Sequence, residues 1–482
     1  MAKYIALTIG PIYKTLKNAK KTRELWGGSY IFSYIMKRLI EEFKDREFIV
    51  PYIKDENIFK SGKEVGLFHD RFIFKAKDGD LEKLKNRISE VLYDISKKSN
   101  IKEEFLKGYF QINYIEKELK DSDNPILKLS PYLDAKELFF KTFQYEKNEL
   151  QEFLKDPERI NNCFLIEDAF CKNKTSFPSL PEIAMYDLKD KINVKKYLNS
   201  DDELKIYENK AIKEQLKPYH KYIAIVQADG DNMGKVVEQL KSKEDFNNFS
   251  KKLFEFCIES HKTIKEYGGL TIFAGGDDLL FFAPVVSNNK TIFNLCDELS
   301  DIFSKKFESY STNPKPSLSL GVSITYNKFP LYEALESARD LLFTKAKSSN
   351  KNAIAFKVIK HSGQEFGTTI PKGLKEVYDN FIVFTSNISG SEDMDNFLHS
   401  IHHKLDTYKD IINLIGKNET KVANFFNNYF NEQEHEAYKS FFEALTNFIV
   451  AVYKEDAIEE KEKLNLIYAS LRFVKFIKGD KE

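Results

Sequence analysis

The spacing of apolar residues predicts strands where apolar and polar positions alternate or a short run is wholly apolar. It predicts helices where apolar residues recur every three or four positions. In the first part of the chain these elements follow the order strand, helix, hairpin, helix and strand, which is typical of a ferredoxin-like sheet. The expected elements are a strand at 4–9, helices up to about 25 and from 29, a hairpin strand at 65–75, a helix at 80–99 and a strand at 109–114.

The same order of elements returns from residue 222 onward. Two pairs of short segments also agree in their letters: YIAL at 4–7 with YIAI at 222–225, and LFHDRFIF at 67–74 with GGDDLLFF at 275–282. Because both pairs occur in the same order, we infer an internal duplication. The expected elements of the second copy are strands at 222–228, 317–325 and 353–358, a hairpin at 270–283, and helices at 246–267, 292–307 and 331–347.

Two further regions show mainly the helical pattern, one between the copies and one after them. We therefore expect an α+β protein with four parts. These are a first ferredoxin-like domain at 1–115, a mostly helical connecting domain at 116–218, a second ferredoxin-like domain at 219–362 and a helical C-terminal domain at 363–482.

Length and composition narrow the class of protein. The chain has 482 residues, more than one hydrophobic core supports, and 42% of them are hydrophobic, which excludes a disordered chain. The 74 Lys and Arg balance the 74 Asp and Glu, whereas proteins that coat nucleic acid by themselves carry an excess of positive charge. The sequence lacks a signal peptide pattern and a membrane-spanning run, and its 4 cysteines are too few for a disulfide framework. We expect a cytoplasmic protein whose main role is not to coat nucleic acid by itself.

A Gly-Gly-Asp-Asp tetrad lies between the two apolar strands of the second hairpin. Gly275 and Gly276 allow positive φ and leave room for a ligand, and a tight turn lets Asp277 and Asp278 converge. Two carboxylates held close together repel each other unless a cation lies between them. A solvated β-turn is the alternative, since Gly and Asp are common turn residues.

A third carboxylate follows the strand expected beside this hairpin. The segment ADGDNMGK at 228–235 places Asp229 near Asp277 and Asp278. Such an oxygen-rich site suits Mg²⁺ or Mn²⁺, and two ions can activate a hydroxyl and stabilise a leaving oxygen. The carbonyl of Gly230 is a further candidate ligand. An Asp-Gly turn with a helix cap is the alternative interpretation.

Two lysines follow the last helix of the second copy. Lys347 and Lys351 are placed to reach nucleotide phosphates from across the site. Lysines near a helix C-terminus also complement the helix dipole, so alone they do not indicate a binding site.

Together these motifs resemble the polymerase/cyclase palm of the large subunit of type III CRISPR effector complexes. The resemblance rests on DGDNMG at 229–234, GGDD at 275–278, and the segments 318–324 and 338–352. IGP at 9–11 and KTRELWGGSY at 21–30 look like the first palm of the Cmr-type (III-B) branch. The resemblance covers roughly residues 1–115 and 219–360.

The resemblance implies an antiviral defence enzyme that polymerises ATP to a 3′–5′ cyclic oligoadenylate-type second messenger when its complex captures target RNA. Its implied partners are the other complex subunits, guide RNA and target RNA, and its cofactors are two Mg²⁺ or Mn²⁺ ions with ATP as substrate. It assigns catalysis to Asp229, Asp277 and Asp278 and metal binding to these residues and Gly230. The implied nucleotide-binding residues are Asp231, Asn232, Gly275, Gly276, Lys347 and Lys351.

The chain departs from the family pattern in three places. Many members begin with an HD nuclease domain, whereas this chain starts at the first palm, so we expect no HD-type DNase activity. Cmr-type members often carry a four-cysteine zinc site between the palms, but only Cys163 and Cys171 fall there, which argues against zinc. Asn350 stands where related cyclases usually have Gly.

The first palm has lost most of the candidate metal ligands. Pro11 replaces Asp229, His69 replaces Asp277, and only Asp70 remains, so we expect this palm to be a scaffold or a wall of the nucleotide cleft. His69 and Asp70 lack the further histidines of an HD site, and we expect His69 to be structural.

Three other functions remain open. In the first, the same palm adenylylates another acceptor, such as S-adenosylmethionine. A diguanylate cyclase-like enzyme is the second, although Asp278 and Leu279 stand where such enzymes have Glu and Phe. A non-catalytic scaffold of an RNA complex is the third, and the intact set of three aspartates argues against it. The sequence leaves the ring size, acceptor, guide and downstream effector open.

Overall fold

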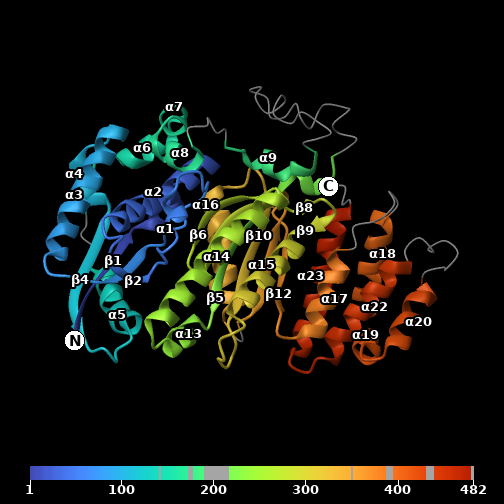
Figure 1. The fold of residues 1–482 in the computed structure, drawn as a ribbon. Helices are drawn as coiled ribbons and strands as arrows, with labels where there is room; N and C mark the ends of the chain where they lie inside the picture. The colour runs from blue at the N-terminus through green and yellow to red at the C-terminus, as the bar shows by residue number, and fades with distance from the viewer. Residues whose placement is uncertain are drawn as a thin grey trace.

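A computed structural model describes residues 1–139, 143–171, 177–188, 216–348, 351–386, 394–429 and 439–478. Two sheets lie side by side, and helices from both ends of the chain flank them (Figure 1). The four-stranded sheet belongs to the N-terminal part, and the six-stranded sheet belongs to the part that begins at residue 222.

The first sheet has the strand order β2-β3-β1-β4. β1 is central and pairs antiparallel with both β3 and β4. Its strands are β1 (Ala2–Gly10), β2 (Glu47–Val50), β3 (Arg71–Lys75) and β4 (Gln111–Leu119). Its helices are α1 (Ile12–Lys17), α2 (Thr22–Glu41), α3 (Asp80–Ser99) and α4 (Glu103–Tyr109).

The second sheet has the order β12-β11-β10-β5-β7-β6, and its β10-β5-β7-β6 part repeats the order of the first sheet. The expected duplication therefore agrees with the topology. Its strands are β5 (Tyr222–Asp231), β6 (Leu270–Gly275), β7 (Asp278–Pro284), β10 (Ser317–Tyr326), β11 (Ala353–Ile359) and β12 (Glu365–Pro371); β8 (Val286–Ser287) and β9 (Lys290–Thr291) form a small hairpin. Its helices are α13 (Met233–Gln239), α14 (Lys243–Tyr267), α15 (Ile292–Phe307) and α16 (Leu331–Asp340), which continues into a π-helical turn (Leu341–Ala346).

Helices α15 and α16 cover opposite faces of this second sheet. The Phe293 ring of α15 lies 5.0 Å from the ring of Phe356, and Phe356 pairs with Val322 of β10. The next residue, Gly321, faces α16, because a Cβ there would lie 2.3 Å from the carbonyl oxygen of Ala338. Successive residues of a strand point to opposite faces, so each helix has its own face.

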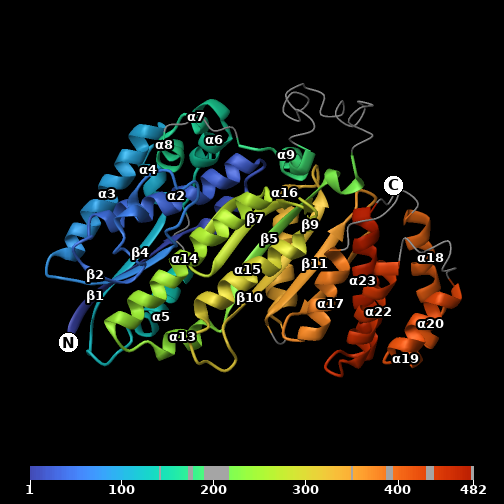
Figure 2. The same ribbon diagram turned by 45° about the vertical axis from the view of Figure 1, so that its right-hand side comes forward.

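Helices make up the connecting and C-terminal regions in the described ranges. The connecting helices are α5 (Pro125–Leu138), α6 (Glu149–Lys155), α7 (Pro157–Asn161), α8 (Phe164–Phe170) and α9 (Leu180–Ala184); short 3-10 turns lie at Glu56–Phe59, Tyr186–Leu188 and Pro218–Lys221. The C-terminal helices are α17 (Lys375–Ser386), α18 (Met394–Thr407), α19 (Lys409–Ile415), α20 (Glu419–Tyr429), α22 (Lys439–Lys454) and α23 (Glu460–Lys478). Figure 2 shows this bundle beside the β11 and β12 side of the second sheet, where Phe473 of α23 lies 4.6 Å from Phe293.

Apart from the small β8–β9 hairpin, which the sequence analysis did not include, two strands of the main sheets differ from the sequence expectations. β2, the partner of β3, was not expected, because its four residues are too few to show alternation. β12 extends the second sheet to Pro371, beyond the expected boundary at 362 and inside a segment expected to be helical. Its sequence, EFGTTIP, carries little apolar signal, and its pairing with β11 defines it as a strand.

The first palm packs against the second through polar and aromatic contacts. The Arg339 guanidinium of α16 lies 3.9 Å from the centre of the Tyr13 ring, and Lys17 pairs with Glu336 at 3.3 Å. Buried apolar residues of both palms and of the C-terminal bundle belong to one continuous core. Among the described helices, none combines the length and hydropathy needed to cross a bilayer.

Candidate active site

The end of β5 and the tip of the β6–β7 hairpin meet at one edge of the second sheet. Ala228 pairs with Leu279, which leaves Asp229 and Asp278 as the next residues beyond that pair. Asp277 lies directly against β5, because a Cβ at Gly230 would be 2.7 Å from its Oδ2. The structure therefore brings together the three carboxylates that the sequence places at this edge.

Lys347 reaches this edge from the end of the π-helical turn. Its ammonium lies 2.6 Å from Asp229 Oδ2 and donates a hydrogen bond of 3.0 Å to the carbonyl oxygen of Gly230. Asp229 pairs with Ser319 of β10, and Ser319 points to the same face of the sheet as Gly321, two residues further along the strand. Because Gly321 faces α16, the π-helical turn that follows α16 lies on the same face as Asp229. One cation thus already lies between two of the oxygens expected to bind metal.

The carboxylates raise one another's affinity for protons. Burial, reinforced by the charge of Asp229, raises the pKa of Asp277 to about 7. Burial also raises the pKa of Asp278 well above its ordinary value, together with the charges of Asp277, Asp229 and Asp70. The pKa of Asp229 is raised by burial as well, although its bond to Lys347 opposes the shift. Such an arrangement favours the arrival of positive charge.

Asp231 is buried behind the carboxylate edge and does not face the cleft. Its side chain is 0% exposed, and its Oδ2 accepts hydrogen bonds from Ser317 Oγ at 2.9 Å and Ser319 Oγ at 2.7 Å. The backbone N–H of Asn352 also donates to it at 2.9 Å, and its Oδ1 lies 3.6 Å from the Lys347 ammonium. The expected direct nucleotide contact of Asp231 is therefore corrected to a positioning role, because a sequence pattern does not show which aspartate faces inward.

The donor set fits a hard divalent cation in its chemistry. Asp229, Asp277, Asp278 and the carbonyl of Gly230 offer oxygen atoms only, which Mg²⁺ and Mn²⁺ prefer. In the described ranges no three His, Cys, Asp or Glu side chains are close enough together to hold a metal ion. The Lys347 ammonium lies between Asp229 Oδ2 and the carbonyl oxygen of Gly230, so it would have to move before these two oxygens could bind a metal.

The remaining expected nucleotide residues lie around this edge. Gly276 has φ of +69°, and a Cβ there would meet nothing within 4 Å, which leaves the hairpin tip open. Gly275 touches the first palm, since a Cβ there would lie 3.2 Å from His69 Cβ. Asn232 donates from Nδ2 to the carbonyl oxygen of Lys315 at 3.2 Å. Lys351 is exposed and acts electrostatically on Asp229, and Asn350 lies outside the described residues.

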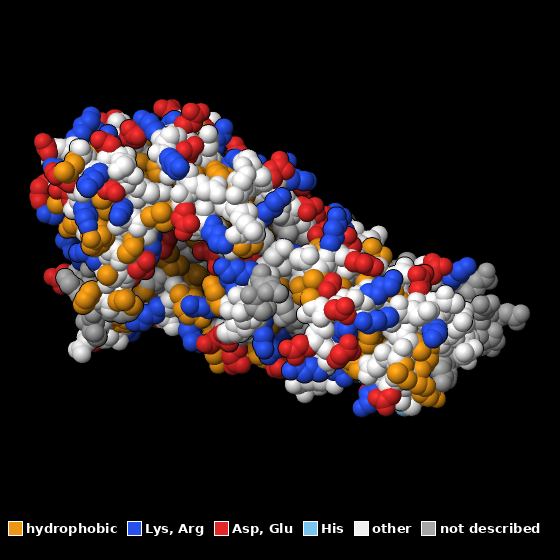
Figure 3. All heavy atoms as spheres, turned by 90° about the horizontal axis from the view of Figure 1, so that it is seen from below, with side chains coloured by type: hydrophobic (Ala, Val, Ile, Leu, Met, Phe, Trp, Pro, Cys, Tyr) orange, Lys and Arg blue, Asp and Glu red, His pale blue; other side chains and the backbone are white. Residues whose placement is uncertain are grey.

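Two adjoining cavities connect the carboxylate edge with the first palm. The smaller, of about 210 Å³, is lined by Asp278 and Gln227 of the second palm and by Tyr13 and Asp70 of the first. The larger, of about 590 Å³, lies between the first palm and the connecting region and shares Tyr13 and Asp70 with the smaller one. Figure 3 shows the molecule from below relative to Figure 1, with a hollow that has hydrophobic side chains inside it and Lys and Arg at its border.

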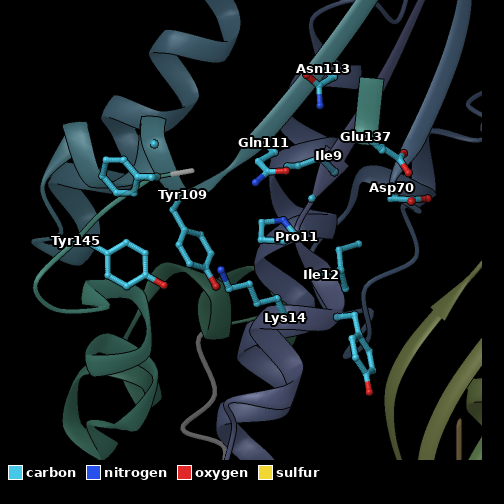
Figure 4. Close-up of a pocket in the computed structure, with 14 residues that line it drawn as sticks. Ile9, Pro11, Ile12, Lys14, Asp70, Tyr109, Gln111, Asn113, Glu137 and Tyr145 are labelled. Carbon is cyan, nitrogen blue, oxygen red and sulfur yellow. The ribbon is translucent and has the colours of Figure 1, made fainter. Parts of the chain in front are cut away.

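The larger cavity has aromatic walls on one side and two carboxylates on the other. Figure 4 shows Tyr109 and Tyr145 on one side, Pro11 in the centre, and Asp70 beside Glu137 on the other side. Burial raises the pKa of Asp70, and burial lowers the pKa of His69 to about 4, so His69 is neutral near pH 7. Residues of the first palm thus line one side of the cavity at the carboxylate edge.

The supporting contacts of the site were not evident from the sequence, although Asp70 itself was noted there. Cys257 of α14 donates from Sγ to the carbonyl oxygen of Gly276 at 3.3 Å and fixes the hairpin tip. Ser317 and Ser319 hold Asp231 from β10. Asp70 adds a carboxylate from the opposite palm. The residues next to them in the sequence do not indicate these contacts, because the contacts form only when strands and helices that are distant in the sequence pack together.

Two family models match consecutive parts of the chain. The model described as "Cas10/Cmr2, second palm domain" matches residues 222–355, and "CRISPR-associated protein Cmr2, N-terminal" matches residues 4–221. A curated relative, the "CRISPR system Cmr subunit Cmr2" of Pyrococcus furiosus, is 31% identical over 221 residues. This match spans 40% of the chain but only 25% of the length of that relative.

Solved structures share the fold at low sequence identity. "Type III-B Cmr-beta" in the apo state matches with a TM-score of 0.56 at 11% identity, over 89% of this chain and 77% of that one. A "Csm1-Csm4 cassette in complex with cA4" matches with a TM-score of 0.52 at 10% identity, over 94% and 70%. The same cassette "in complex with one ATP" matches with a TM-score of 0.54 at 12% identity, over 93% and 69%.

Proposed function

We propose that this chain, which belongs to the Cas10/Cmr2 family of type III CRISPR large subunits, is a nucleotidyltransferase. In this proposal it joins ATP molecules at the sheet edge formed by Asp229, Asp277 and Asp278. One observation carries the proposal: the three carboxylates converge beside a lysine, at a cavity shared by the two palms. A scaffold has no need for a cluster of repelling carboxylates.

The proposed reaction is an in-line displacement at the α-phosphorus of one ATP. A 3′-oxygen of a second ATP forms a bond to this phosphorus, the bond to the β-phosphate oxygen breaks, and pyrophosphate leaves with the electron pair while the hydroxyl proton passes to water. Asp229, Asp277, Asp278 and the carbonyl of Gly230 would hold two Mg²⁺ or Mn²⁺ ions, which supply activation of the hydroxyl and neutralisation of phosphate charge. Lys347 would exchange its bond to Asp229 for a phosphate oxygen, and Gly276 leaves space for the nucleotide.

We assign the acceptor nucleotide to the side of the first palm. Tyr109 and Tyr145 offer aromatic surfaces for an adenine ring, and Gln111 and Asn113 offer hydrogen-bonding groups in the same cavity. Asp70 lies where the two cavities join. The same surfaces suit the adenosine of S-adenosylmethionine, which keeps that acceptor as a second candidate.

The partners we propose are the other subunits of a type III effector complex, with guide RNA and target RNA. Support comes from the similar structures, which include a Csm1-Csm4 cassette and a "Type III-B Cmr-beta bound to cognate target RNA". The product we propose is a cyclic oligoadenylate, since one similar structure holds cA4. The balanced charge of the chain, with 74 basic and 74 acidic residues, suits a subunit that shares RNA with basic partners.

The test is the identity of the nucleotide product. The assembled complex is incubated with target RNA, Mg²⁺ or Mn²⁺ and labelled ATP, with and without S-adenosylmethionine, and the products are separated and weighed by mass spectrometry. We expect pyrophosphate and 3′–5′ linked oligoadenylates in both arms. An adenylylated S-adenosylmethionine would replace the acceptor in the proposal, and ATP left intact in both arms would refute nucleotidyl transfer.

A further inference from the structure

A third cavity opens at the same sheet edge, on the side away from the first palm. It measures about 510 Å³ and lies between the end of α15, the loop before β10 and the start of β11. Lys305, Lys315 and Lys351 line it together with Asn232 and Asn352. Nothing in the proposed nucleotide transfer so far uses Lys305 or Lys315.

The charges around this cavity suit an anion with several phosphate oxygens. In the described part of the chain none of the three lysines forms an ion pair, so their ammonium groups are free to bind a ligand. Asp301 and Glu308 also line the cavity and leave a net excess of one positive charge. A polyphosphate that carries a divalent cation matches such a mixed lining better than a bare anion does.

The cavity is tied to the catalytic strand by hydrogen bonds. Asp231, two residues beyond Asp229, accepts from Ser317 Oγ at 2.9 Å and from the N–H of Asn352 at 2.9 Å, and both of these residues line the cavity. Asn232 binds the carbonyl oxygen of Lys315 at 3.2 Å. The backbone of Lys315 is therefore tied to the residue that follows β5.

The two sides of the carboxylate edge are not equivalent. Asp278 lines the cavity shared with the first palm, whereas Asn232 and Lys351 line the third cavity on the β10–β12 side. In an in-line displacement, the attacking and leaving oxygens lie on opposite sides of the phosphorus. An acceptor that attacks from the first palm therefore sends the leaving group toward Lys351.

We propose that this third cavity receives the pyrophosphate released in each transfer, with Lys305, Lys315 and Lys351 as its ligands. The proposal rests on the proposed function, because its ligand is a product of that reaction. The bond that breaks joins the α-phosphorus to the bridging oxygen, and the departing pyrophosphate, which keeps that oxygen and its electron pair, moves across Lys351 into the cavity. Single-stranded RNA has the same phosphate chemistry and is the alternative occupant to test.

The test uses inorganic pyrophosphate with Mg²⁺, titrated by calorimetry into the full chain without ATP. The variant Lys305→Ala with Lys315→Ala removes two exposed ligands, and Lys251→Ala with Lys262→Ala removes the same charge from the exposed surface of α14. Since hydrogen bonds to charged groups are the strong ones, we expect the Kd for pyrophosphate to rise by about tenfold or more in the first variant only. Inhibition of ATP turnover by added pyrophosphate should weaken by a similar factor.

Equal pyrophosphate binding by the two variants would overturn the proposal, as would absent binding by the unaltered chain. A single-stranded RNA of about 20 nucleotides, which is longer than one typical single-strand binding site, is titrated in parallel. Loss of RNA binding with unchanged pyrophosphate binding would also overturn it, in favour of an RNA contact. Pyrophosphate binding at these lysines in a complex that leaves ATP intact would instead refute the proposed function.

Discussion

Gly230 offers a direct test of how closely the active site is packed. It lies between two aspartates of β5, and a Cβ at this position would lie 2.7 Å from Asp277 Oδ2, 2.8 Å from Asp277 Cβ and 3.0 Å from Met233 Cγ. Ordinary contact begins at 3.4 Å, so Gly230→Ala has to displace the Asp277 carboxylate by about 0.7 Å. Met233 Cγ has to move away by about 0.4 Å as well.

The expected effect falls on turnover more than on folding. A displacement near 1 Å of a positioned group costs about 10²-fold in rate, so we expect Gly230→Ala to lower ATP turnover by roughly 30- to 100-fold. Overpacking of this kind destabilises a protein by roughly 1–3 kcal/mol, which a thermal unfolding curve measures. Turnover is followed as pyrophosphate release by the assembled complex with target RNA.

Gly234→Ala is the matched control, because the same substitution four residues further on would place a Cβ with nothing within 4 Å. We expect this variant to keep its turnover within about twofold, since Ala also suits a helix better than Gly does. If Gly230→Ala and Gly234→Ala turned ATP over at similar rates, Asp277 would not lie where the reaction takes place.

Three other substitutions test separate parts of the structure. Burial lowers the pKa of His69 to about 4, so as pH falls from about 6.5 to 4 the unfolded chain gains a proton that the folded chain lacks, and the free energy of unfolding drops. His69→Gln should remove up to roughly 2 kcal/mol of that drop, measured by urea titrations at pH 7 and pH 5. It should also leave ATP turnover nearly intact, and an altered turnover would contradict a structural role for His69. Asp231→Asn removes the charge that faces Lys347 but keeps the shape, and it should raise KM for ATP several-fold with little loss of stability; unchanged kinetics would count against a positioning role. Gly321→Ala places a Cβ 2.3 Å from the carbonyl oxygen of Ala338, and it should destabilise the fold by about 3 kcal/mol or more in urea unfolding, so wild-type stability would show that α16 packs differently.

The sequence predicted the second palm almost element by element, because its strands and helices are long and strongly patterned. It also placed Asp229 beside Asp277 and Asp278, since a ferredoxin-like order puts the first strand next to the hairpin. β2 and β12 escaped prediction because their pairing partners, rather than their own residues, define them as strands. Short strands of this kind depend on tertiary contacts.

The supporting groups of the site were beyond the reach of the sequence for a related reason. Asp229 and Asp231 share one face of β5, yet only packing against β10 and the segment before β11 decides that Asp231 is buried and Asp229 is not. The ion pair between Lys347 and Asp229 depends on where the π-helical turn ends. Asp70 joins the cleft only because the two hairpin tips touch.

The central claim is that Asp277 and Asp278 carry nucleotidyl transfer, and the double variant Asp277→Ala with Asp278→Ala tests it most directly. The variant and the unaltered chain are each assembled with their partners and target RNA, and pyrophosphate release from labelled ATP is measured with Mg²⁺ and with Mn²⁺. We expect the variant to assemble normally and to lose turnover to background with both metals, because the site keeps only one of its three carboxylates. Full turnover by an assembled double variant would contradict the assignment of the active site.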